Sequence, residues 1–161
     1  SSAQIQLVQK GRVGAKIWRA DDGSAGRAPR FGVSEETLGD GRDIAIAISA
    51  AQATSAQVRT YVARNLPGVA KLIAFGLPSG PGQQSIAGGE HAAVLADQIA
   101  NHLRDLKVSD PDATVHIFAS VPNSLLFYLG QQHQAIAPCI VYEFDFDRQG
   151  SKSYQPSFVI E

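Results

Sequence analysis

The sequence is poor in the residues that mark several common classes of protein. It contains one cysteine, Cys139, which excludes an internal disulfide framework and a cysteine-rich zinc site. It contains no methionine, which indicates either a piece of a longer protein or a removed initiator residue. No run approaches the roughly 20 apolar residues that cross a bilayer, and the first residues lack the apolar stretch of a secretory signal. These absences predict a protein of a reducing compartment, the cytoplasm, with no membrane partner.

An excess of charge of one sign is also absent. The 161 residues include 14 lysines and arginines and 15 aspartates and glutamates, a formal net charge of -1. A chain that holds long nucleic acid on a broad basic surface would be more positive, so that class is disfavoured. A small anionic ligand remains compatible with this balance, because a few local donors can hold it. Hydrophobic residues make up 44% of the chain, enough for one ordinary core.

The motifs of common nucleotide enzymes and hydrolases are missing. The stretch 80–85 (GPGQQS) lacks the Gly-Lys-Ser/Thr of a Walker A loop. It also lacks the third glycine of the dinucleotide-binding fingerprint, and the chain has no Gly-x-Ser-x-Gly nucleophile elbow. The four histidines do not show His-Glu-x-x-His spacing, so we expect no metal and no organic cofactor. His116, in the apolar run TVHIFAS, is interpreted as a hydrogen-bonded residue of the sheet.

Two further sets of reactive side chains are interpreted as structural. Asp145 and Asp147 flank Phe146 and could hold a metal ion from one face of a strand. Such carboxylates more often form the solvent face of an edge strand. Cys139 begins an apolar strand without a charged neighbour in sequence, which is typical of a core thiol rather than a nucleophile. No catalytic residue is assigned, and this domain is predicted not to be an enzyme.

Strand-like and helix-like segments alternate from residue 43 onward. Strands are expected over 44–49, 69–76, 114–119, 138–144 and 154–160, and helices over 55–66, 90–106 and 122–132. This alternation predicts βαβ units and a mostly parallel sheet with helices on both faces. The short last connection predicts an antiparallel hairpin, and Pro156 puts its second strand at an edge. The fold class is therefore α/β, a Rossmann-like three-layer sandwich with a C-terminal antiparallel hairpin.

The first 42 residues carry less pattern. Apolar patches at Ile5–Val8 and Ile17–Trp18 are compatible with a short hairpin, and 21–30 (DDGSAGRAPR) is typical of a loop. We therefore divide the chain into an N-terminal linker or short hairpin over 1–42 and a ligand-sensing domain over 43–161. Four arginines in the first part (Arg12, Arg19, Arg27 and Arg30) leave open a solvated connector or an arm that touches a ligand or a neighbouring subunit.

Polar or glycine-rich segments follow the first three of the expected parallel strands. Ligands bind beyond the carboxyl ends of the strands in an open parallel sheet, and a helix start there favours an anion such as phosphate. Backbone and hydroxyl groups would contact phosphate, ribose or base edges, and aromatic side chains would stack on or cover the bases. The candidate ligand-binding residues are Ser49, Gln52, Thr54, Phe75, Gly76, Ser79, Pro122, Asn123, Ser124 and Tyr154.

The C-terminal part of the chain resembles SAVED domains, which are similar to CARF domains. Residues 116–161 share with them a strand, a turn of small residues with Pro122 and a helix that ends in Leu129-Gly130-Gln131. A strand ending in Tyr142-Glu143 and a final strand with Tyr154-x-Pro156 follow. Residues 43–106 also fit this pattern, whereas 1–42 contribute little to it.

This resemblance implies a sensor of bacterial CBASS anti-phage defence that binds a cyclic di- or trinucleotide. Ligand-driven self-association would then activate an effector (a nuclease, a TIR domain or a protease) in the same or an associated chain. Many SAVED domains have two CARF-like halves, so the single module here is either a compact domain or a fragment.

Two alternatives to a sensor stay open. The first is a ring nuclease that cleaves a cyclic oligonucleotide with help from Ser49, Ser124 or His91. The second is an interaction module without a nucleotide ligand, which pairs with a partner through 154–160. A search for linear products after incubation with cyclic oligonucleotides separates the ring nuclease from the sensor.

Overall fold

The computed structural model describes residues 6–11, 14–82, 84–144 and 154–161. Its strands are β1 (Gln6–Gly11), β2 (Gly14–Arg19), β3 (Gly32–Thr37), β4 (Asp43–Ser49), β5 (Val69–Gly76), β6 (Val115–Ser120), β7 (Cys139–Phe144) and β8 (Tyr154–Ile160). Its helices are α1 (Ser55–Asn65), α2 (Gly89–Ser109), α3 (Asn123–Gln131) and α4 (His133–Ile136). Within this part of the chain, no helix combines the length and the apolar character needed to span a membrane.

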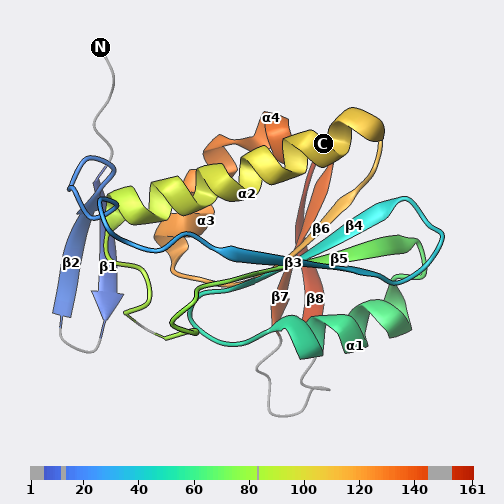
Figure 1. Ribbon diagram of the computed structural model, residues 1–161, viewed down its shortest axis with the longest axis horizontal. Coiled ribbons are helices and arrows are strands. Elements are labelled where there is room, and N and C mark those ends of the chain that lie inside the picture. The colour runs from blue at the N-terminus through green and yellow to red at the C-terminus, as the bar shows by residue number, and fades with distance from the viewer. Residues whose placement is uncertain (1–5, 12–13, 83, 145–153) are drawn as a thin grey trace.

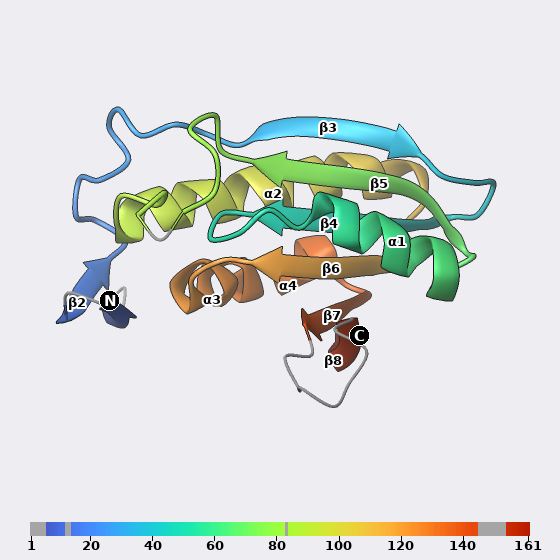
Figure 2. The ribbon, with the colours of Figure 1, turned by 90° about the horizontal axis from the view of Figure 1, so that it is seen from below.

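A six-stranded mixed sheet lies at the centre of the molecule, in the order β3-β5-β4-β6-β7-β8 (Figures 1 and 2). The four inner strands run parallel to one another, and the two edge strands, β3 and β8, pair antiparallel to their neighbours. The parallel sheet and the C-terminal antiparallel pair are thus confirmed. The edge position of β8 accommodates Pro156, which has no N–H to donate to a second neighbour.

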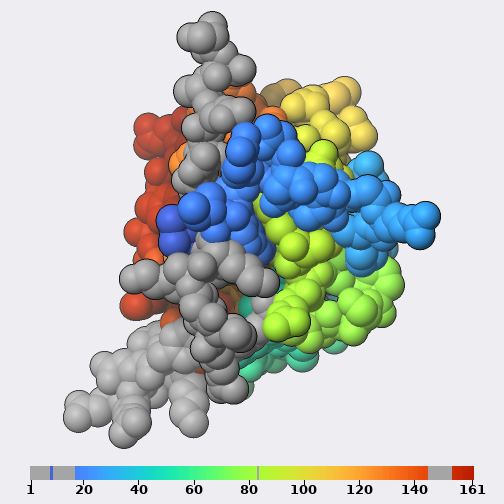
Figure 3. Space-filling view, turned by 90° about the vertical axis from the view of Figure 1, so that its left-hand side faces the viewer, coloured from blue at the N-terminus to red at the C-terminus, as the bar shows by residue number. Residues whose placement is uncertain are grey.

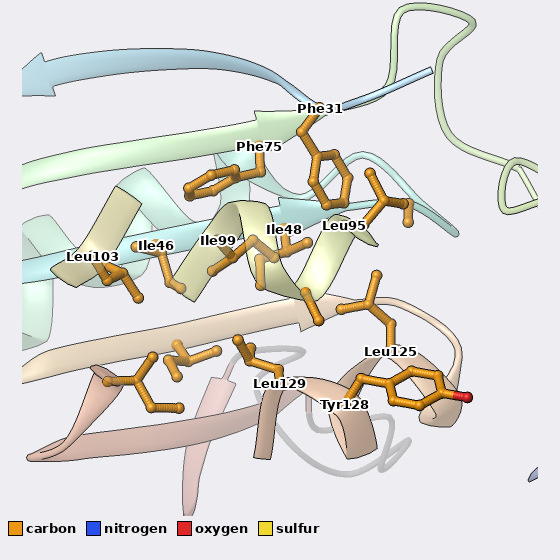
Figure 4. Packing of buried hydrophobic residues seen from close by; sticks show 14 of the residues in the cluster. Phe31, Ile46, Ile48, Phe75, Leu95, Ile99, Leu103, Leu125, Tyr128 and Leu129 are labelled. Carbon is orange, nitrogen blue, oxygen red and sulfur yellow. The ribbon is translucent and has the colours of Figure 1, made fainter. Parts of the chain in front are cut away.

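Helices cover both faces of the sheet, as a three-layer sandwich requires. Figure 1 shows α2, α3 and α4 on one face and α1 on the other. The alternation in the run IAIAIS of β4 serves both faces, because successive side chains of a strand point in opposite directions. Ile46 and Ile48 pack with Leu95 and Ile99 of α2 (Figure 4). The intervening alanines face the smaller cluster that includes Val58 and Val62 of α1.

Part of the N-terminal segment predicted as a linker or short hairpin packs against the rest of the chain. Residues 32–37 form β3 and pair with β5, which the sequence interpretation missed. Gln98 of α2 donates to the Phe31 carbonyl and accepts from the Phe31 N–H, both at 2.8 Å. The ring of Phe31 is buried and packs edge-on against Phe75 at 5.9 Å between centroids. Trp18 of β2 is buried in the same core cluster.

Residues 19–24 close over the first turn of α2, where glycine is required. A Cβ on Gly89 would lie 2.3 Å from the Arg19 carbonyl oxygen, so only glycine allows this approach. Asp22 accepts hydrogen bonds from the N–H groups of Gly89 at 2.8 Å and Glu90 at 3.2 Å. Figure 3 shows the blue N-terminal segment lying directly against the yellow-green part of the chain where α2 begins. The start of α2 is therefore capped from a segment distant in sequence.

Replacing Asp22 with alanine should lower the free energy of unfolding at neutral pH by about 1 kcal/mol, the usual cost of a lost helix cap. The pKa of Asp22 is lowered from its ordinary 3.8 to about 2. Burial raises this pKa, but hydrogen bonds from the Ser24 hydroxyl and from the backbone of Ser24, Gly89 and Glu90 together lower it by more than burial raises it. Equilibrium urea denaturation of both proteins measures the difference.

The same contribution should depend on pH with a defined sign. Because the pKa of the Asp22 carboxyl is lower in the folded state, its contribution is fully present above pH 4 and is lost between about pH 4 and 2. The two unfolding curves should converge over that range. Asp21→Ala is the matched control, since Asp21 makes an exposed ion pair with Arg19 at 3.1 Å, a kind of pair that contributes about 0–1 kcal/mol. Equal losses from the two variants would contradict the capping role.

Candidate ligand-binding site

The chain reverses its winding direction between β4 and β6. From β4 it continues to β5 on one side, and from β6 it continues to β7 on the other. Such a switch point leaves a crevice outside the carboxyl ends of the two strands. Here the N–H groups of Ala50 and Ala51 donate to the Ser120 carbonyl at 3.0 and 2.7 Å. The Ala50 carbonyl in turn accepts from the Ser85 hydroxyl at 2.6 Å, so the strand end is held on both sides.

A cavity of about 480 Å³ opens at this end of the sheet. It is bounded by the segments that follow β4 and β6, by the first turns of α1 and α3, and by the ends of the β7–β8 pair. Its lining residues are Ala51, Gln52, Thr54, Gln57, Ala119, Ser120, Val121, Asn123, Leu126, Val141, Tyr142, Glu143, Phe144, Tyr154 and Phe158. Four of the sequence-predicted residues are therefore brought together: Gln52, Thr54, Asn123 and Tyr154.

Two of the predicted residues shape the turn between β4 and α1. The hydroxyls of Ser49 and Thr54 are 2.8 Å apart, and the Thr54 N–H donates to the Ser49 oxygen at 3.1 Å. Both side chains are buried. These bonds hold Thr54 at the N-cap of α1, where its side chain makes no capping hydrogen bond. The first-turn N–H groups of α1 are thus left without a side-chain cap beside the cavity.

The start of α3 has the same character. Pro122 is its N-cap residue and makes no side-chain capping bond, and it does not line the cavity itself. Asn123 is exposed and lines the cavity. The Ser124 side chain is buried, and its hydroxyl has no hydrogen-bond partner within the described structure. Ser124 is not among the residues that line the cavity.

The wall of the cavity formed by β7 and β8 is aromatic. Ring contacts with Phe118 of β6 and hydrogen bonds that lead through His116 to Asp43 of β4 support it. The ring of Tyr142 stacks on Phe118 at 4.4 Å between centroids, and Tyr154 packs edge-on against Phe118 at 5.0 Å. The Tyr142 hydroxyl lies 2.8 Å from His116 Nδ1, and His116 Nε2 lies 3.3 Å from Asp43. Burial raises the pKa of Tyr142 to about 12, with Tyr61 and Asp43 adding to the effect. His116 is confirmed as a hydrogen-bonded residue of the sheet.

The remaining predicted residues do not join this cavity. Phe75 is fully buried, and its ring packs edge-on with those of Phe31 and His102, so it presents no exposed face to a base in this structure. Gly76 and Ser49 line a second, smaller hollow of about 400 Å³ at the end of β5, and Phe75 bounds it. Ser79 is exposed in the following loop and lines neither hollow. Strand β4 separates the end of β5 from the ends of β6 and β7.

Four residues with side chains suited to binding were missed in the sequence. They are Gln57 on α1, Glu143 and Phe144 at the end of β7, and Phe158 on β8. The rule that led to the other strand ends applies equally to β7, whose last residues were already recognised as a Tyr-Glu motif. Gln57 and Phe158 had no such signal, because their proximity depends on helix and hairpin packing.

Other reactive side chains take structural places. His91 is buried, its Nε2 is 2.7 Å from the Pro29 carbonyl, and its Nδ1 accepts from the Ala87 N–H at 2.9 Å. Cys139 is buried, and burial raises the pKa of its thiol, although Lys107 nearby acts in the opposite direction. Arg19, Arg27 and Arg30 line neither hollow.

Metal-ligating side chains do not gather in the described ranges. There, no three or more His, Cys, Asp or Glu residues are placed to hold a metal ion together. Asp145 and Asp147, like Arg12, lie outside the described residues.

Comparison with known proteins gives a consistent result over almost the whole chain. Residues 1–160 match the family described as SAVED, "SMODS-associated and fused to various effectors sensor domain". The chain is 36% identical over 160 residues to CD-NTase-associated protein 4 of Enterobacter hormaechei subsp. hoffmannii (strain UCI 50). The alignment covers 99% of this chain and 32% of that protein, so the chain spans about a third of the relative's length.

Solved structures from Acinetobacter baumannii share the fold at low sequence identity. The Cap4 SAVED/CARF-domain containing receptor with the cyclic trinucleotide 3'3'3'-cAAA superposes with a TM-score of 0.71 at 16% identity, over 97% of this chain and 32% of the receptor. The same receptor with 2'3'3'-cAAA gives a TM-score of 0.68 at 17% identity, over 96% of this chain and 32% of the receptor. The α/β sandwich described above is thus shared with receptors that hold cyclic trinucleotides.

Proposed function

The chain belongs to the SAVED family of sensor domains, and we propose on that basis that it binds a cyclic oligonucleotide of three nucleotides at the crevice between β4 and β6. Binding would be the input to an effector in the same or an associated chain, activated by ligand-driven self-association. We propose that the domain acts in bacterial CBASS anti-phage defence, in the cytoplasm. The domain itself would act by binding and not by catalysis.

One observation carries this proposal: two helices begin at the same cavity, and neither start is capped by a side chain. The first turns of α1 and α3 both border the cavity at the switch point. The free N–H groups and the macrodipole of a helix start favour phosphate. A cyclic trinucleotide has three phosphates and needs several such donors. Backbone donors also explain how a chain of net charge -1 can hold an anionic ligand.

The aromatic end of the cavity suits the nucleobases. Tyr154 and Phe158 of β8 border it, and Phe158 is 52% exposed. Nucleobases stack on aromatic rings with little dependence on sequence, which supplies binding energy. The cavity thus has a polar side for phosphates at the helix starts and an apolar side for bases at the β7–β8 end.

The full-length protein that contains this chain should be stabilised against thermal unfolding by 3'3'3'-cAAA or 2'3'3'-cAAA, the ligands of the Cap4 receptors. Stabilisation reports binding to the folded state, and linear trinucleotides are the control. Size-exclusion chromatography with the bound ligand tests self-association. Linear products after incubation would favour a ring nuclease instead. No shift with any cyclic compound would overturn the proposal and favour a protein-interaction module.

Asn123→Ala should weaken binding of the cyclic trinucleotide by about tenfold, which corresponds to about 1.4 kcal/mol. The variant removes an exposed amide at the cavity without changing the core. Ser124→Ala should bind normally, because the Ser124 hydroxyl is buried away from the cavity. Asn101→Ala is the distant control, since the Asn101 amide oxygen accepts from Arg104 at 2.7 Å on the exposed side of α2. Isothermal titration calorimetry measures all four proteins, and unchanged affinity for Asn123→Ala would remove the α3 start from the site.

A further inference from the structure

A single acidic side chain, Glu143, stands out among the described residues that line the cavity at the switch point. Every other lining residue is uncharged, and no lysine or arginine is included. A carboxylate at this position is unexpected in a site proposed for a ligand with three phosphates. A contact between this carboxylate and such a ligand would be with a part other than the phosphates, because like charges repel.

Glu143 is placed at the aromatic end of the cavity. It lies between Tyr142 and Phe144 near the end of β7, and its side chain is exposed. Glu143 is paired in register with Gln155 of β8, and a register shift separates this pair from the pair of Val141 with Phe158. Glu143 and Phe158 both line the cavity, so the carboxylate borders the same space as an exposed aromatic ring.

The chemistry of a carboxylate determines what it can meet there. An ionised carboxylate only accepts hydrogen bonds, and it repels a phosphate at short range. The helix starts attract phosphate. The helix starts and the carboxylate together therefore favour a ligand orientation in which the phosphates face the helix starts and point away from Glu143. The donors that a cyclic oligonucleotide can offer to an acceptor are the exocyclic amino group and ring N–H of a base and the ribose hydroxyl.

We propose that Glu143 is a specificity-determining residue that accepts a hydrogen bond from a donor on a base or ribose of the bound cyclic oligonucleotide. This inference rests on the proposed function and adds the selection of the ligand. A stacked base at the β7–β8 end would present its edge, or the hydroxyl of its ribose, to the carboxylate. Ligands without the donor would leave a desolvated carboxylate unpaired and would be rejected.

The test is a set of binding measurements on the full-length protein with three probes. They are 3'3'3'-cAAA, its analogue with purine riboside in place of adenosine, which lacks the 6-amino group, and its 2'-deoxy analogue. Glu143→Ala should bind cAAA about tenfold or more weakly than the wild type, because a hydrogen bond to a charged group is lost. Against the analogue that lacks the relevant donor, the variant should bind at least as tightly as the wild type, because alanine removes the unpaired carboxylate. The probe that abolishes or reverses the weakening identifies the donor as base or ribose.

Gln155→Ala is the matched control. Gln155 is the cross-strand partner of Glu143 on β8, is exposed, and does not line the cavity. It should bind all three probes as the wild type does, and thermal unfolding without ligand checks that both variants are folded. If wild type binds cAAA and Glu143→Ala binds it equally well, the role of Glu143 is overturned while the proposed function stands. If wild type binds none of the probes, the proposed function fails and this inference fails with it.

Discussion

Replacing Phe118 with alanine should lower the free energy of unfolding by about 3–5 kcal/mol, the usual cost of removing a fully buried ring. Phe118 is 0% exposed and lies at the centre of the aromatic cluster behind the cavity. Its ring stacks on Tyr142 with an interplanar angle of 14° and meets Tyr61 edge-on at 5.6 Å. The variant loses the transfer free energy of the ring and these contacts, and it leaves a void between α1 and the sheet. Equilibrium urea denaturation measures the change.

Phe127→Ala is the appropriate control for this experiment. Phe127 lies on α3, is 42% exposed, and within the described part of the chain its ring contacts that of Tyr128 at 5.9 Å. Its truncation should lower the free energy of unfolding by less than about 1 kcal/mol, because the exposed ring buries little apolar surface on folding. A loss for Phe118→Ala no greater than that for Phe127→Ala would show that the cluster behind the cavity is not tightly packed.

Replacing Lys107 with methionine should lower the free energy of unfolding by about 2 kcal/mol. Lys107 is 9% exposed, and its ammonium group donates to the Ile136 carbonyl at 2.9 Å and to the Ala137 carbonyl at the end of α4. Burial lowers the pKa of Lys107, so holding the charge there has a cost, and the nearby Cys139 acts in the opposite direction. Methionine preserves the packing of the stem but leaves the two carbonyls without their charged donor. The unpaired acceptors outweigh the relief of removing a buried charge.

Lys71→Met separates this effect from the loss of a lysine in general. Lys71 is partly exposed and lies 3.8 Å from Glu35 at the β3 edge of the sheet. A surface pair of this kind contributes about 0–1 kcal/mol. Chemical denaturation of the two variants side by side gives the comparison, and a Lys107→Met variant as stable as the wild type would mean that water satisfies the α4 carbonyls.

The regular part of the fold could be predicted because the spacing of apolar residues along the sequence shows which side chains of a strand or helix are buried. In β4 the isoleucines and the alanines alternate, and both faces of the strand are buried. The isoleucines pack in the larger core cluster and the alanines in the smaller one. In α2 the apolar spacing predicts the helix over 90–106, and the extra turn to Ser109 follows because Lys107 points inward to carbonyl partners. The resemblance to SAVED domains, based on residues 43–106 and 116–161, is confirmed by a family match over residues 1–160.

Strand β3 could not be predicted in the same way. Its sequence, GVSEET, has almost no apolar alternation, and most of its side chains are exposed. It is held by ladder hydrogen bonds to β5, and the exposed ion pair of Arg59 with Glu36 adds about 0–1 kcal/mol. Neither depends on a periodic pattern within the strand. The contacts of Asp22 and Phe31 with α2 are likewise between residues more than sixty positions apart.

The candidate site shows the same division. The sequence alone determined that three strand ends are polar and meet at one edge of a parallel sheet, because strand polarity and turn residues are local properties. Only the tertiary structure decided which strand ends share a cavity, because β4 separates the end of β5 from those of β6 and β7. Phe75, Gly76 and Ser79 therefore do not line the cavity, whereas Gln57, Glu143 and Phe158 do. Strand order and the packing of α1 and β8 depend on contacts between distant segments. No local pattern of residues encodes these contacts, and they decide where a charge such as Glu143 lies.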